Sequence, residues 1–276
     1  MLTKVARVFN EPEYLKLSES LIRFIYANLI SKNGRLLHRY RNGKSEILGN
    51  LNDYAFMIWG LIELFETTFN SEYLEKALNL NKILIEHFWN NIHGGFYFIS
   101  DEGEKLLIRQ KDIYDGAIPS GNSVSILNLL RLGKILMRPE FENMGEKILK
   151  TFGTLIRKAP TSFSHSLMAL DFAIGPSIEI IIAGNYDSIE TQQMLNYIRK
   201  KFIPNKIVLL NSSRKKSIKV NGMNKILEQK KQIGGRTTVY ICKDYSFELP
   251  RPKGRWIRNS SKIALQGRVL HLLQTH

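Results

Sequence analysis

Three segments of the chain begin with the same short pattern, and this repeat restricts the fold more than any other feature. Each opens with Pro or Ser, continues with Glu and an aromatic residue, and then places apolar residues three and four positions apart; the segments start at Pro12, Ser71 and Pro139. This spacing is typical of an amphipathic helix, and Pro or Ser before Glu suits its first turn. The sequence therefore predicts three helices of one kind.

A second apolar helix precedes two of these repeats. Segments 51–69 and 123–137 are apolar nearly all round, and only two or three residues connect each of them to the repeat that follows. Residues 2–9 have the pattern of the end of a third such helix. Each unit is therefore an αα-hairpin, and hairpins repeated in this way are typical of a toroid with an inner and an outer layer. We expect the all-apolar helices to form the inner layer.

Beyond Gly175 the pattern changes to short β-branched runs that flank one helical segment. Runs of this length are typical of buried strands, so they predict a small α/β unit that is parallel in part. The expected fold class is mainly α, with a partial (α/α)6 toroid of about three hairpins followed by this α/β unit. The expected domains are the toroid segment 1–176, the α/β unit 177–250 and an unassigned basic tail 251–276.

Composition excludes several classes of protein. The chain of 276 residues has no apolar run of membrane-spanning length and no secretory leader pattern at its start. Its one cysteine, Cys242, excludes an internal disulfide framework and a multi-cysteine metal site, and no histidine pair has the spacing of metal ligands. We expect a cytoplasmic protein with no metal, no cofactor and no membrane partner.

The net charge of +15 is concentrated in the last third of the chain. Residues 177–276 hold 19 basic and 6 acidic side chains, whereas residues 51–176 hold 12 and 15. A basic surface can attract nucleic acid. No base-reading motif accompanies it here, so we do not expect a nucleic-acid partner.

The stretch DGAIPSGNS, immediately before the apolar segment 123–137, is the first candidate site. Asp115, Ser120, Asn122 and Ser123 could bind a small polar ligand at the start of an inner helix, where N–H groups and the helix dipole attract anions and hydroxyls. Alternatively, these residues only cap the helix and shape the turn. A serine nucleophile is not expected, because there is no Gly-x-Ser-x-Gly elbow.

Arg109 and Lys111 precede that stretch and could converge on an anionic or polyhydroxyl ligand, or form an exposed ion-pair cluster with Asp112. Asp53 and Tyr54 begin the apolar segment 51–69. Asp53 could interact favourably with the positive end of the helix dipole. Alternatively, it could act as a general acid or base with Tyr54 beside it.

Three further candidates are aromatic or imidazole side chains. Trp89 and Phe96 flank the glycine pair Gly94-Gly95, and they could stack on a sugar face or simply belong to the core. His165 begins another inner-type helix and could be a catalytic base or a core residue. Glu63, deeper in segment 51–69, is a further candidate with the same two interpretations as Asp53.

Four motifs resemble the C-terminal part of the thioredoxin-domain-containing family that includes spermatogenesis-associated protein 20. They are LNDYAFMIWGLIELFE, FW…GGFYF, LLIRQKDIYDGAIPSGNSVSILNLLRLG and IEIIIAG…FIPNKIVLL. The resemblance covers about residues 5–250. It implies a thioredoxin-like domain, then an (α/α)6 barrel similar to sugar epimerases and hairpin glycosidases, then a small α/β region. Epimerases of that fold abstract protons with barrel histidines, and this is what the resemblance implies for His165.

This chain departs from the family pattern in ways that shape the functional expectation. The thioredoxin-like domain and its Cys-x-x-Cys are absent, and Phe247 occupies the position of a second cysteine found in relatives, so we expect no dithiol redox activity. We expect a truncated or split member with a carbohydrate-related binding or isomerising role toward a sugar or small polar ligand. The alternative is a non-catalytic scaffold that completes a half-barrel with a partner chain. The sequence leaves open whether the chain is an enzyme.

Overall fold

The computed structural model describes residues 1–103, 107–212, 227–243, 246–247 and 251–252. The chain divides into two compact units, Met1–Gly175 and Pro176–His276. The predicted basic tail lies outside the described residues from residue 253 onward.

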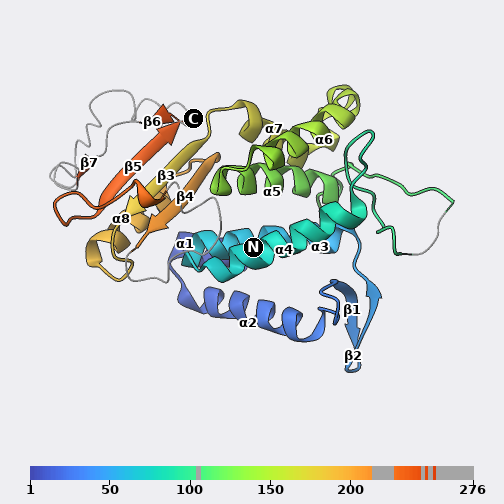
Figure 1. Cartoon of the computed structure of the whole chain (residues 1–276), viewed down its shortest axis with the longest axis horizontal. Helices are drawn as coiled ribbons and strands as arrows, with labels where there is room; N and C mark the ends of the chain where they lie inside the picture. Colours follow the sequence, from blue (N-terminus) through green and yellow to red (C-terminus); the bar gives the residue numbers. More distant parts are fainter. Residues whose placement is uncertain (104–106, 213–226, 244–245, 248–250, 253–276) are drawn as a thin grey trace. The chain divides into compact units, whose positions relative to one another are not determined.

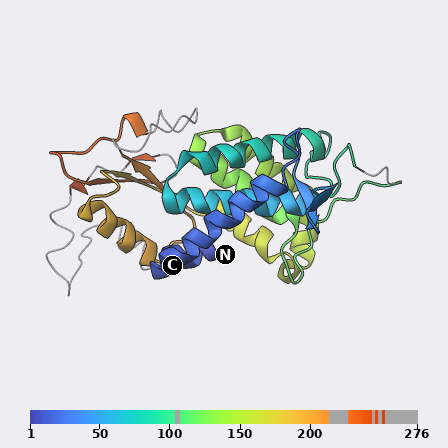
Figure 2. The same cartoon turned by 90° about the horizontal axis from the view of Figure 1, so that it is seen from below.

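The first unit consists of helical hairpins arranged in two layers (Figures 1 and 2). The inner helices pack side by side in chain order, and each outer helix packs on the inner helix that precedes it. The inner helices are α1 (Leu2–Phe9), α3 (Leu51–Thr68), α5 (Gly121–Leu136) and α7 (Ser164–Ile174); the outer helices are α2 (Pro12–Asn28), α4 (Ser71–Phe88) and α6 (Pro139–Lys158). The predicted mainly helical fold, a partial α/α toroid followed by a small α/β unit, is confirmed.

Local sequence explains where these helices begin and end. The side chain of Asn50 accepts hydrogen bonds from the first turn of α3, while Asp53 accepts one from the Asn50 N–H, which completes a capping box. Proline occupies the first turn of α2 and α6, where no N–H is required. Helix α5 begins at Gly121, two residues before the predicted start, because Ser120 acts as its N-cap.

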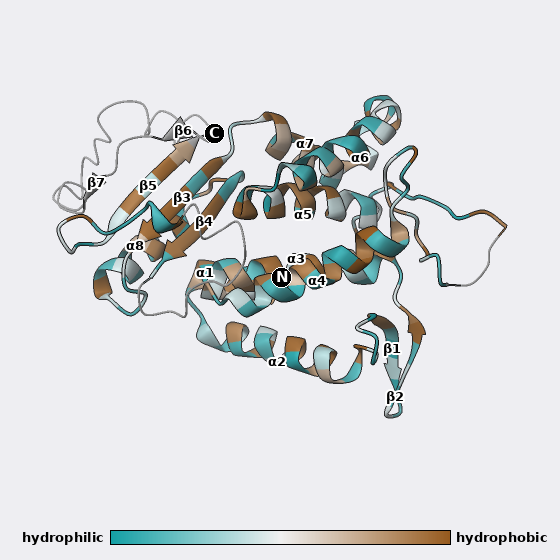
Figure 3. Cartoon of the chain, in the orientation of Figure 1, coloured by the Kyte–Doolittle hydropathy of each residue, from teal (hydrophilic) through white to brown (hydrophobic). Residues whose placement is uncertain are grey.

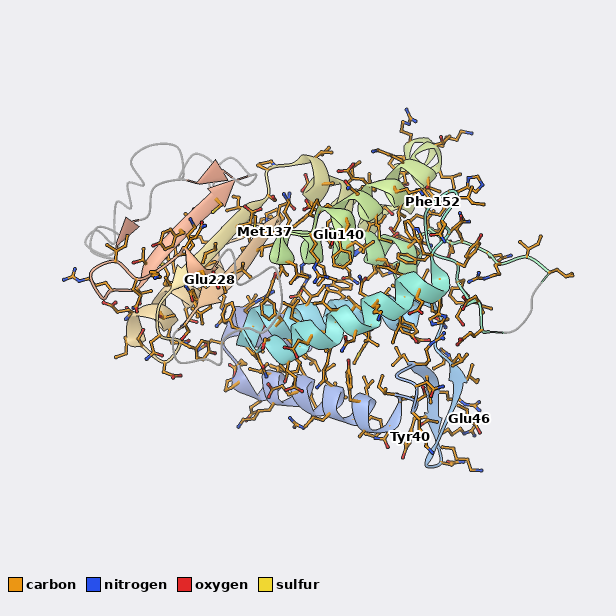
Figure 4. The ribbon with its side chains drawn as sticks, in the orientation of Figure 1. Tyr40, Glu46, Met137, Glu140, Phe152 and Glu228 are labelled. Carbon is orange, nitrogen blue, oxygen red and sulfur yellow. The ribbon has the colours of Figure 1, made fainter. Side chains whose placement is uncertain are left out.

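The core lies between the two layers. Helices α3 and α5 are buried on almost every side, as expected for inner helices, and Tyr54, Phe65 and Phe88 are among the largest fully buried side chains. Figure 3 shows the matching apolar colour along α3 and α5. Phe152 of α6, labelled in Figure 4, packs over Gly95, where a Cβ would lie 3.2 Å from Cε2 of the Phe152 ring.

Two excursions connect the hairpins. The first, after α2, forms an antiparallel pair of strands, β1 (Leu37–Arg41) and β2 (Lys44–Leu48). A short 3-10 turn, η1 (Pro160–Ser162), connects α6 to α7. The second, after α4, carries strand-like sequence but its described part makes only an isolated bridge between Trp89 and Phe96. Its backbone groups bond partly to other backbone groups, as Tyr97 N does to Phe88 O, and partly to side chains, such as Asn122 at Phe96.

The second unit contains a mixed sheet. Strands β3 (Ile178–Ala183) and β4 (Lys206–Asn211) are parallel and are joined by helix α8 (Ile189–Lys200), whereas β5 (Thr238–Lys243) pairs antiparallel with β3. The short strands β6 (Ser246–Phe247) and β7 (Arg251–Pro252) both pair with β5. Most residues of β3 and β4 are apolar and buried, as is typical of strands in the interior of a sheet.

Candidate functional site

The N-termini of three inner helices gather at one end of the helical unit. Gly121 at the start of α5 lies against the first turn of α3, so closely that a Cβ there would be 2.5 Å from both Asn52 Oδ1 and Leu51 Cγ. The carboxylate of Asp115 joins the loop before α5 to the first turn of α7. The DGAIPSGNS stretch therefore lies where the inner helices begin.

Asp115 is buried, and backbone N–H groups occupy its carboxylate. Oδ1 accepts a hydrogen bond from Ser120 N at 2.9 Å, and Oδ2 accepts bonds from His165 N at 2.8 Å and Ser166 N at 3.2 Å. Asp115 thus shapes its own loop and caps α7. Three donors leave this carboxylate little capacity for a ligand.

The other polar residues of the stretch also bond within the protein. Ser120 Oγ accepts a bond from Ser123 N at 3.1 Å, and Ser123 Oγ lies 2.8 Å from Ser166 Oγ. Asn122 is fully buried; its amide nitrogen donates to Phe96 O and Asp112 O, and its oxygen accepts from Phe96 N. These side chains fasten the loop to α7 and to the excursion after α4. Their assignment to ligand binding stays a prediction.

Asp53 and Tyr54 also bond within the protein. Asp53 Oδ2 accepts a bond from Asn50 N at 2.8 Å and lies 2.9 Å from His38 Nδ1. Tyr54 is fully buried, and its hydroxyl accepts a bond from Leu36 N at 2.9 Å. Both residues connect the start of α3 to the β1–β2 excursion.

Trp89, Phe96, Arg109 and Lys111 form a separate group in the excursion after α4. Arg109 donates to Ile99 O at 2.7 Å, and Lys111 Nζ donates to Gly94 O at 3.0 Å. The Trp89 and Phe96 rings meet edge to face at 5.0 Å. Burial lowers the pKa of Lys111. In the described part of the chain, no hydrogen bond, ion pair or ring contact joins this group to Asp115 or His165.

His165 differs from these residues because one of its polar atoms is not used. The side chain is buried, with 5% of the residue exposed, and its Nε2 has no hydrogen-bond partner among the described residues. Burial lowers the pKa of His165 and Lys4 acts in the same direction, while Asp115 acts in the opposite one. The neutral form of the imidazole is therefore favoured at pH 7.

Trp59, which sequence reasoning did not select, lies beside this imidazole. The two ring centroids are 5.1 Å apart, although Trp59 belongs to α3 and His165 to α7. Trp59 Nε1 donates to Glu63 Oε1 at 3.2 Å, and Lys4 Nζ lies 5.1 Å from the indole centroid. An imidazole, an indole and an ammonium group thus meet across three inner helices.

Glu63 also belongs to a buried ion network that fixes its charge. Arg131 Nη1 and Arg7 Nη2 each lie 2.8 Å from a Glu63 oxygen, and Glu66 pairs with the same two arginines. Burial alone would raise the pKa of Glu63, but Arg131, Arg7 and Lys4 together lower it to about 2. Glu63 is therefore an ionised acceptor for the Trp59 indole.

One sequence signal pointed toward this network. Glu63, Glu66 and Arg131 interrupt helices that are otherwise apolar, and buried charges need partners. The pairing itself joins α1, α3 and α5, so no local pattern could reveal it. Within the described residues, no three His, Cys, Asp or Glu side chains gather as a metal site would require.

Comparison with curated proteins identifies relatives. Over 204 residues the chain is 33% identical to spermatogenesis-associated protein 20 of Rattus norvegicus and 31% identical to that of Homo sapiens; each alignment covers 73% of this chain and 26% of the relative. An uncharacterized protein of Caenorhabditis elegans is 28% identical over 259 residues, which cover 90% of this chain and 34% of that protein. The chain thus spans about a quarter to a third of the length of these relatives. No protein-family model matches it.

Solved structures that resemble part of the chain include a cellobiose 2-epimerase and a D-mannose isomerase. Cellobiose 2-epimerase from Bacillus thermoamylovorans is 16% identical, with a TM-score of 0.46 over 55% of this chain and 41% of that one. A D-mannose isomerase is 18% identical, with a TM-score of 0.46 over 59% of this chain and 40% of that one.

In the described part of the chain, no helix is both long and apolar enough to span a membrane.

Proposed function

The chain is homologous to part of spermatogenesis-associated protein 20, and we propose that its helical unit binds a small polyhydroxyl ligand of the sugar type at His165 and Trp59. The observation that supports this proposal is the buried Nε2 atom of His165 without a hydrogen-bond partner. Leaving such an atom unpaired costs about 1–3 kcal/mol, and a ligand hydroxyl would recover that cost.

The chemistry around Nε2 suits a sugar better than an anion or an apolar molecule. The Trp59 indole offers a flat apolar face of the kind that packs on a sugar ring, and the neutral imidazole bonds a hydroxyl either as donor or as acceptor. Buried polar atoms without partners also occur in Asn81, Ser100 and Ser125. None of those three side chains titrates near neutral pH.

Trp59 also controls access to the imidazole in this proposal. The indole is half-buried and lies over the His165 ring, and its hydrogen bond to Glu63 holds it there. A ligand reaches Nε2 when the indole swings aside, and the indole then packs on the bound ring. Glu63 is accordingly a positioning residue for Trp59.

With a reducing sugar in its open-chain form, His165 would act as a general base. Nε2 takes the proton from the carbon next to the carbonyl group, the C–H electron pair forms a C=C bond, and the carbonyl oxygen takes up the displaced pair and a proton from water. Return of a proton from the imidazolium to carbon, with loss of a hydroxyl proton to water, gives the isomer. No oxidant, reductant or metal is needed.

Binding can be tested by saturation-transfer NMR and calorimetry on the purified chain with a panel of monosaccharides and disaccharides. We expect at least one sugar to bind the wild type, His165→Asn to weaken that binding at least tenfold, and His93→Asn to leave it unchanged, because His93 is exposed. A folded wild-type chain that binds no sugar, or equal binding by the His165→Asn variant, would contradict the proposal.

A further inference from the structure

Arg35, in the excursion after α2, is a buried cation whose hydrogen bonds are incomplete. Its side chain is 8% exposed. Nη1 donates to a carboxylate oxygen of Glu102, and Nε donates to the Tyr54 hydroxyl at 3.4 Å. Nη2 is buried and has no hydrogen-bond partner among the described residues. A carboxylate can bind both Nη atoms of an arginine at once, and here only one of them is in use.

Glu102 is a weakly held counterion for this guanidinium. Its side chain is 58% exposed, and the hydrogen bond that it accepts comes from Nη1. It belongs to the turn 100–103, which the bond from Gly103 N to Ser100 O closes at 3.2 Å. By contrast, the Glu63 side chain is 5% exposed and pairs with two arginines. Because water already solvates the Glu102 carboxylate, an external carboxylate can replace it on Arg35 at little cost.

The same turn holds a second unused polar atom. Ser100 is buried, and its Oγ has no hydrogen-bond partner in the part of the chain that the structure describes. Ser100 precedes Glu102 by two residues, and Glu102 itself reaches Arg35. Buried polar atoms without partners are rare in folded proteins. Two of them in contacting segments, both able to donate a hydrogen bond, indicate a missing acceptor.

The excursion that carries Arg35 is strongly basic. Residues 31–48 contain five Lys or Arg side chains and one acidic side chain, Glu46, which pairs with Arg39. The three remaining basic side chains of this excursion are exposed: Lys32, Arg41 and Lys44. A surface of this kind raises the local concentration of anions. An anionic ligand is therefore attracted to the segment in which the incompletely paired guanidinium lies.

We propose that Arg35 binds the carboxylate of a small organic acid, which replaces Glu102 on the guanidinium. The ligand carboxylate accepts hydrogen bonds from Nη1 and Nη2 together, and Glu102 turns out into water. Glu102 marks the place of the ligand oxygen at Nη1, since its own carboxylate oxygen lies there now. This site is separate from the proposed sugar site, because no described hydrogen bond of Arg35 involves His165 or Trp59.

The test is NMR of the full chain labelled with ¹⁵N-arginine, in which the Nε resonance of Arg35 reports on its ligands. Glu102→Gln shifts this resonance and Arg35→Lys removes it, so the two variants identify it. Sodium succinate is the probe, and sodium chloride at the same ionic strength corrects for screening. We expect millimolar binding to the wild type. Binding to Glu102→Gln should be at least fivefold tighter, because the internal carboxylate no longer competes for the guanidinium.

Glu46→Gln, at a residue labelled in Figure 4, is the matched control. It removes one negative charge, as Glu102→Gln does, but the arginine that it leaves, Arg39, is exposed. Succinate binding at Arg35 should change less than twofold. The proposal is overturned if succinate moves the Arg35 resonance in neither the wild type nor Glu102→Gln, or if both Gln variants tighten binding equally. Tighter binding of inorganic phosphate than of succinate would overturn the assignment to a carboxylate.

Discussion

Asp115 connects the beginnings of two inner helices with a single carboxylate. Its three acceptor contacts reach the N–H groups of Ser120, His165 and Ser166, and two of these belong to the first turn of α7. A carboxylate at this place also meets the positive end of the α7 dipole. Asp115 thereby fixes the backbone from which His165 projects.

Replacement of Asp115 by Ala should lower the free energy of unfolding by about 2–3 kcal/mol, because a cap is lost and buried N–H groups remain unpaired. Urea denaturation measures this change. Asp112→Ala is the control, since Asp112 is exposed and accepts one local bond from Tyr114 N; it should cost less than about 1 kcal/mol. Equal losses in the two variants would show that the Asp115 contacts do not contribute specifically.

The lowered pKa of His165 links its protonation to stability. In the unfolded chain the imidazole binds a proton near its ordinary pKa of 6.5, whereas the folded protein resists protonation. The unfolded state therefore binds more protons below that pH, and the free energy of unfolding should fall as the pH drops from 7 to 5. His165→Gln should make this fall shallower in denaturation curves recorded across that range. An unchanged pH slope would contradict the burial argument.

Within the ion network, replacement of Glu63 should lower the free energy of unfolding more than replacement of any other member. Glu63→Gln leaves Arg131 and Arg7 with incomplete compensation, and removing one partner of a buried pair costs about 3–5 kcal/mol. Glu146→Gln, which removes a surface pair with Lys150, should change stability by less than about 0.5 kcal/mol. Because the pKa of Glu63 is about 2 against an ordinary 4.5, its contribution should persist at pH 5 and disappear only as the pH falls toward 2.

At the scale of elements, the close approach of α3 and α5 depends on Gly121. Gly121→Ala would place a methyl group 2.5 Å from Asn52 Oδ1, so one helix must shift, at a cost of about 1–3 kcal/mol. Gly153 in α6 has open space around its Cα, and Gly153→Ala should stabilise the protein by up to about 1 kcal/mol through helix propensity. Thermal unfolding of both variants measures the contrast. A stabilised Gly121→Ala variant would show that the two helices are not in close contact.

The hairpins could be predicted from sequence because their signals are local. Apolar spacing located α3, α4 and α6, and the difference between all-apolar and amphipathic segments separated the inner layer from the outer one. The excursion after α4 was harder to predict, because the side chain of Asn122, in the first turn of α5, takes up the backbone hydrogen bonds of Phe96. Long-range side-chain partners of this kind leave no periodic signal.

At the scale of the whole molecule, the candidate site depends on packing between distant segments. His165 could be selected from sequence as a residue that begins an inner helix, but its neighbour Trp59 reads as one more apolar residue of α3. The two rings come from helices that are distant in sequence, and α5 packs against both of these helices. The order of inner helices is therefore what brings the residues of the candidate site together.

The most direct test of the proposed site is NMR of the full chain labelled with ¹⁵N-histidine. The chain has six histidines, and the variant His165→Asn identifies the resonances of His165. When monosaccharides and disaccharides are added one at a time, we predict that at least one shifts the Nε2 resonance of His165 and leaves the exposed His93 unchanged. If no sugar moves the His165 resonance in the folded protein, the central claim is wrong.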